Sequence, residues 1–304
     1  MGNPRSIGLA AIAAITYCAT ISCAPPHAPT QGEVAAVLSA LILRPDRTCA
    51  EMRQDFGLGP MPLVDTPAEV GIAYEEHSLL TPDGEQLHLW YLPAAHERGV
   101  VVLSAGNSGS MTCYLFTAWL LWRGGWSVVM YDYEGFGEST GTPSLLTLRS
   151  DLDAVVDWTR TQKGYPQVTL MGISLGSIPS IALAVEQPDA VNGVVLDSPV
   201  ALGAGIERFN VLLAGRGDEI LALLEPWLDT EATIAQMTQP LLVYEDGQDM
   251  VTPPATVERL YDLAPGPKRI VRFPDLGHAR GQFFSTATYA LYLDLFLTSV
   301  WGEP

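Results

Sequence analysis

The sequence predicts an α/β fold, with a mostly parallel sheet of eight strands flanked by helices. Three observations lead to this prediction. Short runs of Val, Leu and Ile recur along the chain, as in strands that are buried on both faces of a parallel sheet. Segments with helical periodicity separate these runs, which implies right-handed crossover connections. A length of 304 residues with 48% apolar residues suits one large catalytic domain with a complete core.

Residues 1–23 resemble a secretory signal. One arginine and no acidic residue precede an apolar stretch at residues 7–21, which is too short to span a membrane comfortably. Thr20-Ile-Ser-Cys23 resembles the cleavage box of bacterial lipoproteins, although Thr20 stands where leucine is usual. We therefore expect an exported protein, periplasmic or at the cell surface. Three outcomes remain open: membrane attachment through a lipidated Cys23, ordinary signal cleavage, or a retained anchor.

Residues 24–65 are expected to form a tether and two N-terminal helices. Residues 24–31 are rich in proline, and residues 33–43 have helical periodicity. Thr48 and Glu51 have the spacing of a capping box, which predicts a second short helix. We expect these helices to pack on the outside of the main domain, or near its site, where they would shape substrate access.

The main domain is expected over residues 66–304. Residues 71–79 and 86–92 alternate in polarity around a Pro-Asp-Gly turn, which predicts an antiparallel hairpin. Buried strands should follow at residues 100–103, 127–131, 168–171, 193–196, 241–244 and 269–273. Helices are expected between them, among others at residues 145–161 and 253–263.

One connection between predicted strands is much longer than the others. Residues 199–239 separate two predicted strands by about forty residues, which is more than such a connection needs. Residues 206–213 and 219–228 look helical and rich in apolar side chains. The interval is either an ordinary crossover or a small helical lid over the site, and we favour the lid.

Charge and cysteine usage narrow the classes of function. A net charge of −18 and a pI near 4.5 argue against nucleic acid or an anionic membrane surface as the main partner. Cys49 and Cys113 remain in the folded body after signal removal. They could pair in an oxidising compartment, but two cysteines without CxxC spacing are more often buried thiols. No His or Cys cluster has metal-ligand spacing, so we expect no metal and no cofactor.

The most informative motif lies where a predicted strand runs into a helix. Gly172-Ile-Ser174-Leu-Gly176 follows a buried strand and precedes an apolar stretch at residues 178–185, an arrangement that presents a nucleophilic serine. Gly137-Glu-Ser139-Thr-Gly141 has the same pattern, but helix-breaking residues follow it. Ser174 is therefore the predicted nucleophile, and Ser139 is predicted to be a loop residue.

A serine nucleophile needs a histidine base that is oriented by a carboxylate. These partners should follow in the order Ser, Asp, His. His278 is the one histidine after Ser174, and it comes directly after the last predicted strand. Asp249 is the best-placed acid, because it follows the preceding strand and lies just before a Thr-Pro helix start. Three alternative acids remain open: Glu245, Asp246 and Asp197.

The developing negative charge of an acyl-transfer reaction also needs backbone N–H donors. One should come from Leu175, the residue after the nucleophile. The other should come from the glycine-rich loop at residues 104–109, where Asn107 is the predicted donor.

Five motifs occur together in this chain. They are Thr-Pro-Ala-Glu-Val-Gly-Ile-Ala-Tyr-Glu-Glu at 66–76, Pro-Asp-Gly at 82–84, Tyr-Asp-Tyr-Glu-Gly-Phe-Gly-Glu-Ser-Thr-Gly-Thr-Pro-Ser at 131–144, Gly-Ile-Ser-Leu-Gly at 172–176, and Gly277-His278. Together they resemble α/β-hydrolases of the serine-aminopeptidase-like and monoacylglycerol-lipase-like group, over residues 66–296. The resemblance implies the roles given above for Ser174, His278, Asp249, Asn107 and Leu175, and a structural role for the loop at residues 132–137.

One departure from that family lies in the oxyanion loop. The family usually has His-Gly-Asn there, whereas Ala105 occupies the position of the histidine and Ser104 is the nearest polar side chain. The backbone donor is retained, so the departure bears on the positioning of the loop and on the polarity of the substrate.

The sequence thus predicts an exported serine hydrolase that cleaves a small-molecule acyl ester through an acyl-enzyme intermediate. An aminopeptidase or acyl-thioesterase with the same triad is the alternative enzyme. An aminopeptidase would need an acidic group to hold the substrate ammonium, and Glu207, Asp218 or Glu219 of the interval at residues 199–239 could supply it. A different class of function is a catalytically silent surface binding protein on a hydrolase scaffold.

Overall fold

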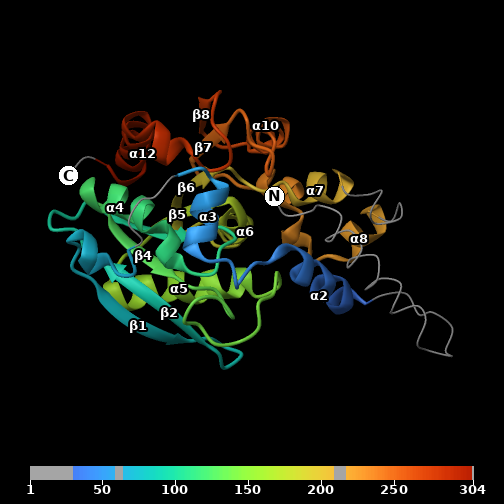
Figure 1. The fold of residues 1–304 in the computed structure, drawn as a ribbon, viewed down its shortest axis with the longest axis horizontal. Coiled ribbons are helices and arrows are strands. Elements are labelled where there is room, and N and C mark those ends of the chain that lie inside the picture. Colours follow the sequence, from blue (N-terminus) through green and yellow to red (C-terminus); the bar gives the residue numbers. More distant parts are fainter. Residues whose placement is uncertain (1–29, 59–63, 209–216, 303–304) are drawn as a thin grey trace.

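A single sheet of eight strands forms the centre of the molecule in the computed structural model, which describes residues 30–58, 64–208 and 217–302 (Figure 1). The strand order is β1-β2-β4-β3-β5-β6-β7-β8. β2 pairs antiparallel with both β1 and β4, and the strands from β3 to β8 are parallel to one another. The bounds are β1 Glu75–Leu80, β2 Gln86–Leu92, β3 Val100–Ser104, β4 Ser127–Tyr131, β5 Val168–Ile173, β6 Val191–Asp197, β7 Leu241–Asp246 and β8 Lys268–Phe273. The predicted fold class is confirmed.

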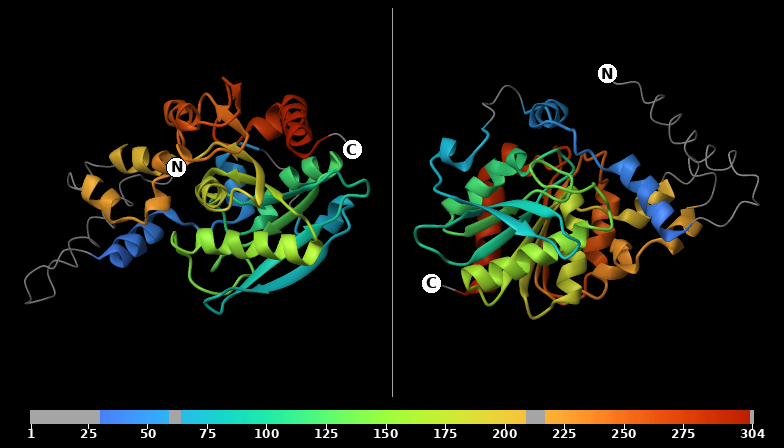
Figure 2. Two further views of the ribbon diagram at one scale, coloured as in Figure 1. Left: turned by 180° about the vertical axis from the view of Figure 1, so that it is seen from behind. Right: turned by 90° about the horizontal axis from the view of Figure 1, so that it is seen from below.

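Two layers of helices cover the sheet (Figures 1 and 2). α4 (Leu115–Arg123) contacts α12 (Thr286–Trp301) on one face, and α5 (Leu148–Lys163) contacts α6 (Ser177–Glu186) on the other. α10 (Pro254–Leu263) contacts β7, close to the predicted bounds. The short helix α11 (Gly281–Phe284) precedes α12.

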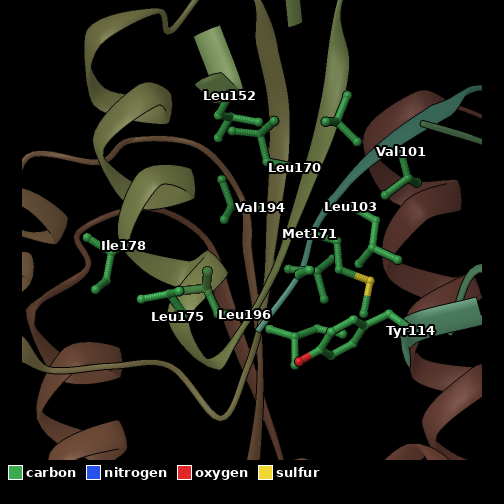
Figure 3. Close-up of a cluster of buried hydrophobic side chains, with 14 of the residues drawn as sticks. Val101, Leu103, Tyr114, Leu152, Leu170, Met171, Leu175, Ile178, Val194 and Leu196 are labelled. Atoms are coloured by element: carbon green, nitrogen blue, oxygen red, sulfur yellow. The ribbon is translucent and has the colours of Figure 1, made fainter. Parts of the chain in front are cut away.

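The alternation of side chains along β5 divides the core between the two faces of the sheet. Leu170 points toward Leu152 of α5, whereas Met171 points to the opposite side, toward Tyr114 (Figure 3). Tyr114 ends the short helix η2 (Met111–Tyr114). Leu152, Leu170 and Met171 are fully buried, and burying such a side chain stabilises the fold by roughly 1.5–3 kcal/mol.

The N-terminal helices α2 (Gln31–Ile42) and α3 (Cys49–Asp55) each begin with a capping box. The box predicted at Thr48 and Glu51 is confirmed. α2 contacts α8 (Gly217–Leu223), which belongs to the interval at residues 199–239. The Leu145 N–H donates to Ser39 Oγ of α2 at 2.9 Å, which draws residue 145 away from the helix predicted over 145–161. α5 accordingly begins only at residue 148.

Cys49 of α3 and Cys113 of η2 form a disulfide, with their Cα atoms 5.0 Å apart. The expectation of two buried thiols is therefore wrong. The two cysteines are 64 residues apart in sequence, so their proximity depends on how α3 packs against η2.

The interval at residues 199–239 contains α7 (Leu202–Arg208), α8 (Gly217–Leu223), η4 (Pro226–Leu228) and α9 (Thr230–Ile234). The helix predicted at 206–213 begins earlier, at residue 202, and residues 209–213 of that prediction lie outside the described residues. Glu231 of α9 accepts hydrogen bonds from the Gly203 and Ala204 N–H groups, which have no partners within the helix at the start of α7. The described parts of the interval are thus largely helical and joined by hydrogen bonds between α7 and α9, and the action of the interval as a lid stays a prediction.

Within residues 30–58, 64–208 and 217–302, no helix combines the length and apolar character needed to cross a membrane. The predicted signal and Cys23 lie outside the described residues.

A buried acidic pair joins α5 to the loop after β4. Asp151 is fully buried in the first turn of α5, and its Oδ2 accepts the Glu134 N–H at 3.0 Å. In the described part of the chain, Asp151 Oδ1 and Glu134 Oε1 have no hydrogen-bond partner. Burial, together with the neighbouring Glu134 and Asp83 carboxylates, raises the pKa of Asp151 well above its usual range.

Asp151→Asn should stabilise the protein at pH 8 more than at pH 5. The folded state binds the Asp151 proton more tightly than the unfolded state, so the free energy of unfolding of the wild type falls as pH rises above about 4. An amide at position 151 does not titrate, so the pH-dependent loss of stability disappears, and the amide also adds a hydrogen-bond donor. The free energy of unfolding should rise by about 1–3 kcal/mol at pH 8. Urea denaturation at both pH values measures it. Asp157→Asn, an exposed position on the same helix, is the control, and equal gains at both pH values would contradict the prediction.

Candidate active site

Ser174 lies directly after β5, in the turn η3 (Ser174–Gly176) that leads into α6. Its φ of +49° is in the left-handed region, which is strained for a residue other than glycine. A Cβ on Gly172 would overlap the Gly176 carbonyl, and a Cβ on Gly176 would overlap the Ser104 carbonyl of β3. The turn therefore needs glycine at both positions, since backbone atoms occupy the space of a side chain.

The structure brings Ser174, His278 and Asp249 into one hydrogen-bonded line. His278 Nε2 lies 2.9 Å from Ser174 Oγ, and His278 Nδ1 lies 2.7 Å from Asp249 Oδ2. The three residues are 8%, 9% and 3% exposed. They come from the loops after β5, β8 and β7, which end at the same edge of the parallel sheet.

Asp249 is held as a carboxylate by its surroundings. Its Oδ1 accepts the Val251 and Thr252 N–H groups at 2.7 and 2.9 Å, and its Oδ2 accepts the Thr252 hydroxyl at 2.7 Å. Burial alone would raise the pKa of Asp249, but the hydrogen bonds from His278 and Thr252 outweigh it and the pKa is lowered. An ionised Asp249 accepts the Nδ1 proton of His278, which leaves Nε2 free to accept the Ser174 hydroxyl.

The three alternative acids have other partners. Asp197 accepts from Tyr289 Oη at 2.8 Å, Asp246 accepts the Arg280 N–H at 2.9 Å, and Glu245 pairs with Arg272 at 3.4 Å. Burial and the neighbouring carboxylates raise the pKa of both Asp197 and Asp246. Of the described acidic side chains, Asp249 is the one that hydrogen-bonds to His278.

The two predicted oxyanion donors lie on adjoining segments. Leu175 follows Ser174 in η3, and Asn107 lies in the loop that follows Ser104, against which the η3 turn packs. The Asn107 amide binds the N-terminal region: its Oδ1 accepts the Arg44 N–H at 2.8 Å, and its Nδ2 donates to the Ile42 carbonyl at 2.6 Å. The Asn107 side chain is therefore engaged, and its backbone N–H is the group available to donate to an oxyanion.

Two tyrosines contact the loop where Ala105 replaces the family's histidine. Tyr133 Oη donates to the Ala105 carbonyl at 2.9 Å. Tyr131 Oη lies 3.0 Å from Ser104 Oγ. Both phenols are buried, so they support the start of the loop from the side of β4.

The loop at residues 132–137 supports the far end of the oxyanion loop. Asp132 Oδ1 accepts the Met111 N–H at 2.6 Å, and the Gly137 N–H donates to the Gly109 carbonyl at 2.6 Å. Ser139 Oγ donates to the Asp132 carbonyl at 2.7 Å. The serine of the second Gly-x-Ser-x-Gly match thus fixes a loop, as predicted for a loop residue.

Sequence reasoning missed two side chains that contact the His278 imidazole. Thr252 Oγ1 lies 3.3 Å from His278 Nδ1 while it donates to Asp249. The Phe56 ring meets the His278 ring edge-on, with centroids 5.8 Å apart. The Thr-Pro pair after Asp249 could have suggested Thr252, whereas nothing in the local sequence connects Phe56 with His278.

One group of described residues has the spacing of a metal site. The ligand atoms of Glu76, His88 and Glu138 lie within 4.8 Å of one another. His88 Nε2 already binds Glu76 at 2.7 Å, and Nδ1 lies 3.3 Å from Asp132. Burial alone would lower the pKa of His88, but these carboxylates outweigh it and raise the pKa. The hydrogen bonds of His88 to Glu76 and Asp132 account for the proximity of this group.

Comparison with known proteins agrees with this architecture. Residues 95–226, which include Ser174, match the family described as serine aminopeptidase, S33. An uncharacterized protein of Mycobacterium tuberculosis is 31% identical over 238 residues, which cover 72% of this chain and 76% of that protein. The uncharacterized protein YfhR of Escherichia coli O157:H7 is 33% identical over 207 residues, 64% of this chain and 70% of YfhR.

Among solved structures, an esterase from Pyrococcus furiosus has the same fold. It superposes with a TM-score of 0.64 at 19% identity, over 80% of this chain and 97% of the esterase. The sequence matches and this shared fold show that the chain belongs to the serine-aminopeptidase-like group of α/β-hydrolases.

Proposed function

We propose that this hydrolase cleaves carboxylic esters through a covalent acyl-serine intermediate. The observation that carries the proposal is the hydrogen-bonded line from Ser174 through His278 to Asp249. An isolated serine hydroxyl is a poor nucleophile, and a histidine base held by a carboxylate is the arrangement that activates it. Both bonds have the lengths of good hydrogen bonds.

The proposed reaction has two halves. Ser174 Oγ attacks the ester carbonyl while His278 Nε2 takes its proton, and the backbone N–H groups of Leu175 and Asn107 stabilise the oxyanion. The imidazolium then gives the proton to the departing alcohol. A water molecule attacks the acyl-serine in the same way, and the acid product leaves. Asp249 keeps the imidazole oriented throughout and stabilises its charged form.

Substitution of the proposed triad should remove ester turnover. Ser174→Ala and His278→Ala should each lower kcat on the order of 10⁶-fold, and Asp249→Asn by about 10⁴-fold, as when comparable groups are removed from other serine hydrolases. Initial rates of p-nitrophenyl acetate and butyrate hydrolysis measure this.

Ser139→Ala is the matched control, because Ser139 occupies the second Gly-x-Ser-x-Gly sequence but hydrogen-bonds to the backbone of its own loop. It should keep activity within about tenfold of the wild type, because its two hydrogen bonds, to the Asp132 carbonyl and from the His88 N–H, do not involve the proposed triad. A fluorophosphonate should label the wild type and Ser139→Ala but not Ser174→Ala. Ester turnover that survives in Ser174→Ala would rule out the proposal, and an inert, unlabelled wild type would favour a silent binding protein.

Aminopeptidase or thioesterase activity is the second candidate, and the description of the matching family favours the aminopeptidase. Glu207 of α7 and Asp218 of α8 are exposed acids on the interval at residues 199–239. Either could hold a substrate ammonium, as could Glu219.

A panel of substrates separates these activities. For an esterase, kcat/KM on p-nitrophenyl esters should exceed that on aminoacyl-p-nitroanilides by at least about 100-fold, and Glu207→Gln with Asp218→Asn should leave ester turnover unchanged, because a neutral acyl group presents no ammonium to these carboxylates. The reverse preference, lost in the same double variant, would identify an aminopeptidase. Release of a thiol from acyl-thioesters at a higher kcat/KM than from esters would identify a thioesterase.

We also propose that the protein is exported and anchored through a lipidated Cys23. Support comes from the apolar stretch before Thr20-Ile-Ser-Cys23. In a bacterial host, the mature protein should begin at Cys23 with a diacylglyceryl mass and fractionate with membranes, because acyl chains anchor it to a bilayer. Cys23→Ala should abolish both, whereas Cys18→Ala should not. A mature protein without lipid would mean ordinary signal cleavage, and an unprocessed N-terminus would mean a retained anchor.

A further inference from the structure

Residues 42–57, which run from the last residue of α2 through α3, contact the oxyanion loop directly. The Asn107 amide donates to the Ile42 carbonyl and accepts from the Arg44 N–H, and the Gly109 N–H donates to the Arg47 carbonyl at 2.7 Å. A Cβ on Gly109 would lie 2.6 Å from the Pro45 carbonyl, so the two backbones are in close contact. The loop therefore takes its outer hydrogen bonds from residues that precede the matching family region by about fifty positions.

The same segment also contacts the loop that carries His278. The Phe56 ring lies edge-on to the imidazole, with centroids 5.8 Å apart. Two residues after His278, Arg280 Nη2 donates to the Asp55 carbonyl at 3.2 Å. Arg47 connects the two contacts: it pairs with Asp55 at 2.6 Å, lies 5.6 Å above the Phe56 ring, and reaches the Asn107 carbonyl at 3.4 Å.

A covalent bond holds this segment in place. Cys49, in the middle of the segment, is joined to Cys113 of η2, and η2 directly follows the oxyanion loop. The hydrogen bonds to the oxyanion loop and to Arg280, and the ring contact between Phe56 and His278, are each worth at most about 1.5 kcal/mol. The disulfide is thus the strongest link between the segment and the rest of the chain.

We propose that residues 42–57 form a clasp that belongs to the active site: it sets the positions of the Asn107 backbone N–H and of His278, and the Cys49–Cys113 bond keeps it in place. The proposal rests on the proposed function for its effect on turnover. Arg47, Phe56 and the Asn107 side chain are positioning residues, because they act through the groups that meet the substrate.

The expected effect is on kcat more than on KM. An oxyanion donor contributes mainly in the transition state, so its displacement slows chemistry without weakening binding of the ground state. A shift of about 1 Å in a catalytic group can cost on the order of 100-fold in rate, and loss of a donor costs on the order of 10² to 10³.

The first experiment opens the disulfide in the full chain. Dithiothreitol donates two electrons and two protons to the bond, which yields two thiols and the cyclic disulfide of the reagent. Reduced wild type and Cys49→Ser/Cys113→Ser should both show a kcat for p-nitrophenyl butyrate lower by about tenfold or more, with KM within about threefold. The double variant should no longer respond to dithiothreitol. Unchanged kcat in both, with thiol titration showing complete reduction, would overturn the proposal.

A second pair of variants covers the case in which loss of the disulfide unfolds the protein. Arg47 and Arg149 are matched: each forms an ion pair, with Asp55 and Glu186, and each lies over an aromatic ring, Phe56 and Trp227. Arg47 alone of the two also contacts the oxyanion loop. Arg47→Ala should lower kcat about tenfold while Arg149→Ala leaves it within about twofold, at a similar small cost in stability.

Phe56 gives a further check on the position of His278. Phe56→Ala should lower kcat, and Phe56→Tyr, which keeps the ring, should restore it. The proposal would be overturned if the three variants Arg47→Ala, Arg149→Ala and Phe56→Ala had the same kcat, irrespective of the result of opening the disulfide.

Hydrogen exchange separates failure of the clasp from failure of the proposed function. Reduction should speed amide exchange at residues 104–109 and 277–280 and leave the central strands protected. If the protein hydrolyses no ester, this readout still tests the clasp. Unchanged exchange in both loops after complete reduction would overturn the clasp even in an active esterase.

Discussion

The close crossing of β3, β5 and α6 is the constraint on which the site depends. Neither Gly172 nor Gly176 has room for a Cβ, because the backbone of the turn and the end of β3 fill that space. This crossing holds Ser174 at a positive φ and brings the start of the oxyanion loop against the turn that carries the serine. The strain is maintained because strands buried on both faces flank it.

Near this crossing, three buried carboxyl groups differ in the direction in which their pKa is shifted. Asp197, Asp246 and Asp249 are all buried near the ends of β6 and β7, yet the pKa is raised at Asp197 and Asp246 and lowered at Asp249. Asp249 alone of the three has the imidazole and two N–H groups as donors. Several buried acids can therefore share a small volume, since only one of them needs to be ionised.

Much of the architecture was predictable, because apolar strand runs and capping boxes can be recognised in short stretches of sequence. The candidate triad was predictable from the order of Ser174, Asp249 and His278 along the chain. Asp249 was separable from Asp197 only by the position of each after its strand. The disulfide was not predictable, since its cysteines meet only when α3 packs against η2. Contacts across long sequence separations were equally hidden: Phe56 against His278, and the Asn107 amide against residues 42 and 44.

The clasp lies early in the chain, but it contacts the loop that carries His278, which is synthesised much later. Asp55 and Arg280 are 225 positions apart, whereas Cys49 and Cys113 are 64 apart. As the chain emerges, the cysteines can therefore be joined once η2 has formed, while the loop bearing His278 arrives only after β8. We expect the turn that carries Ser174 and the clasp to be assembled before His278 reaches them, so that the proposed triad is completed at the final stage of folding. An unfinished chain that ends before β8 would therefore lack His278, the base of the proposed triad.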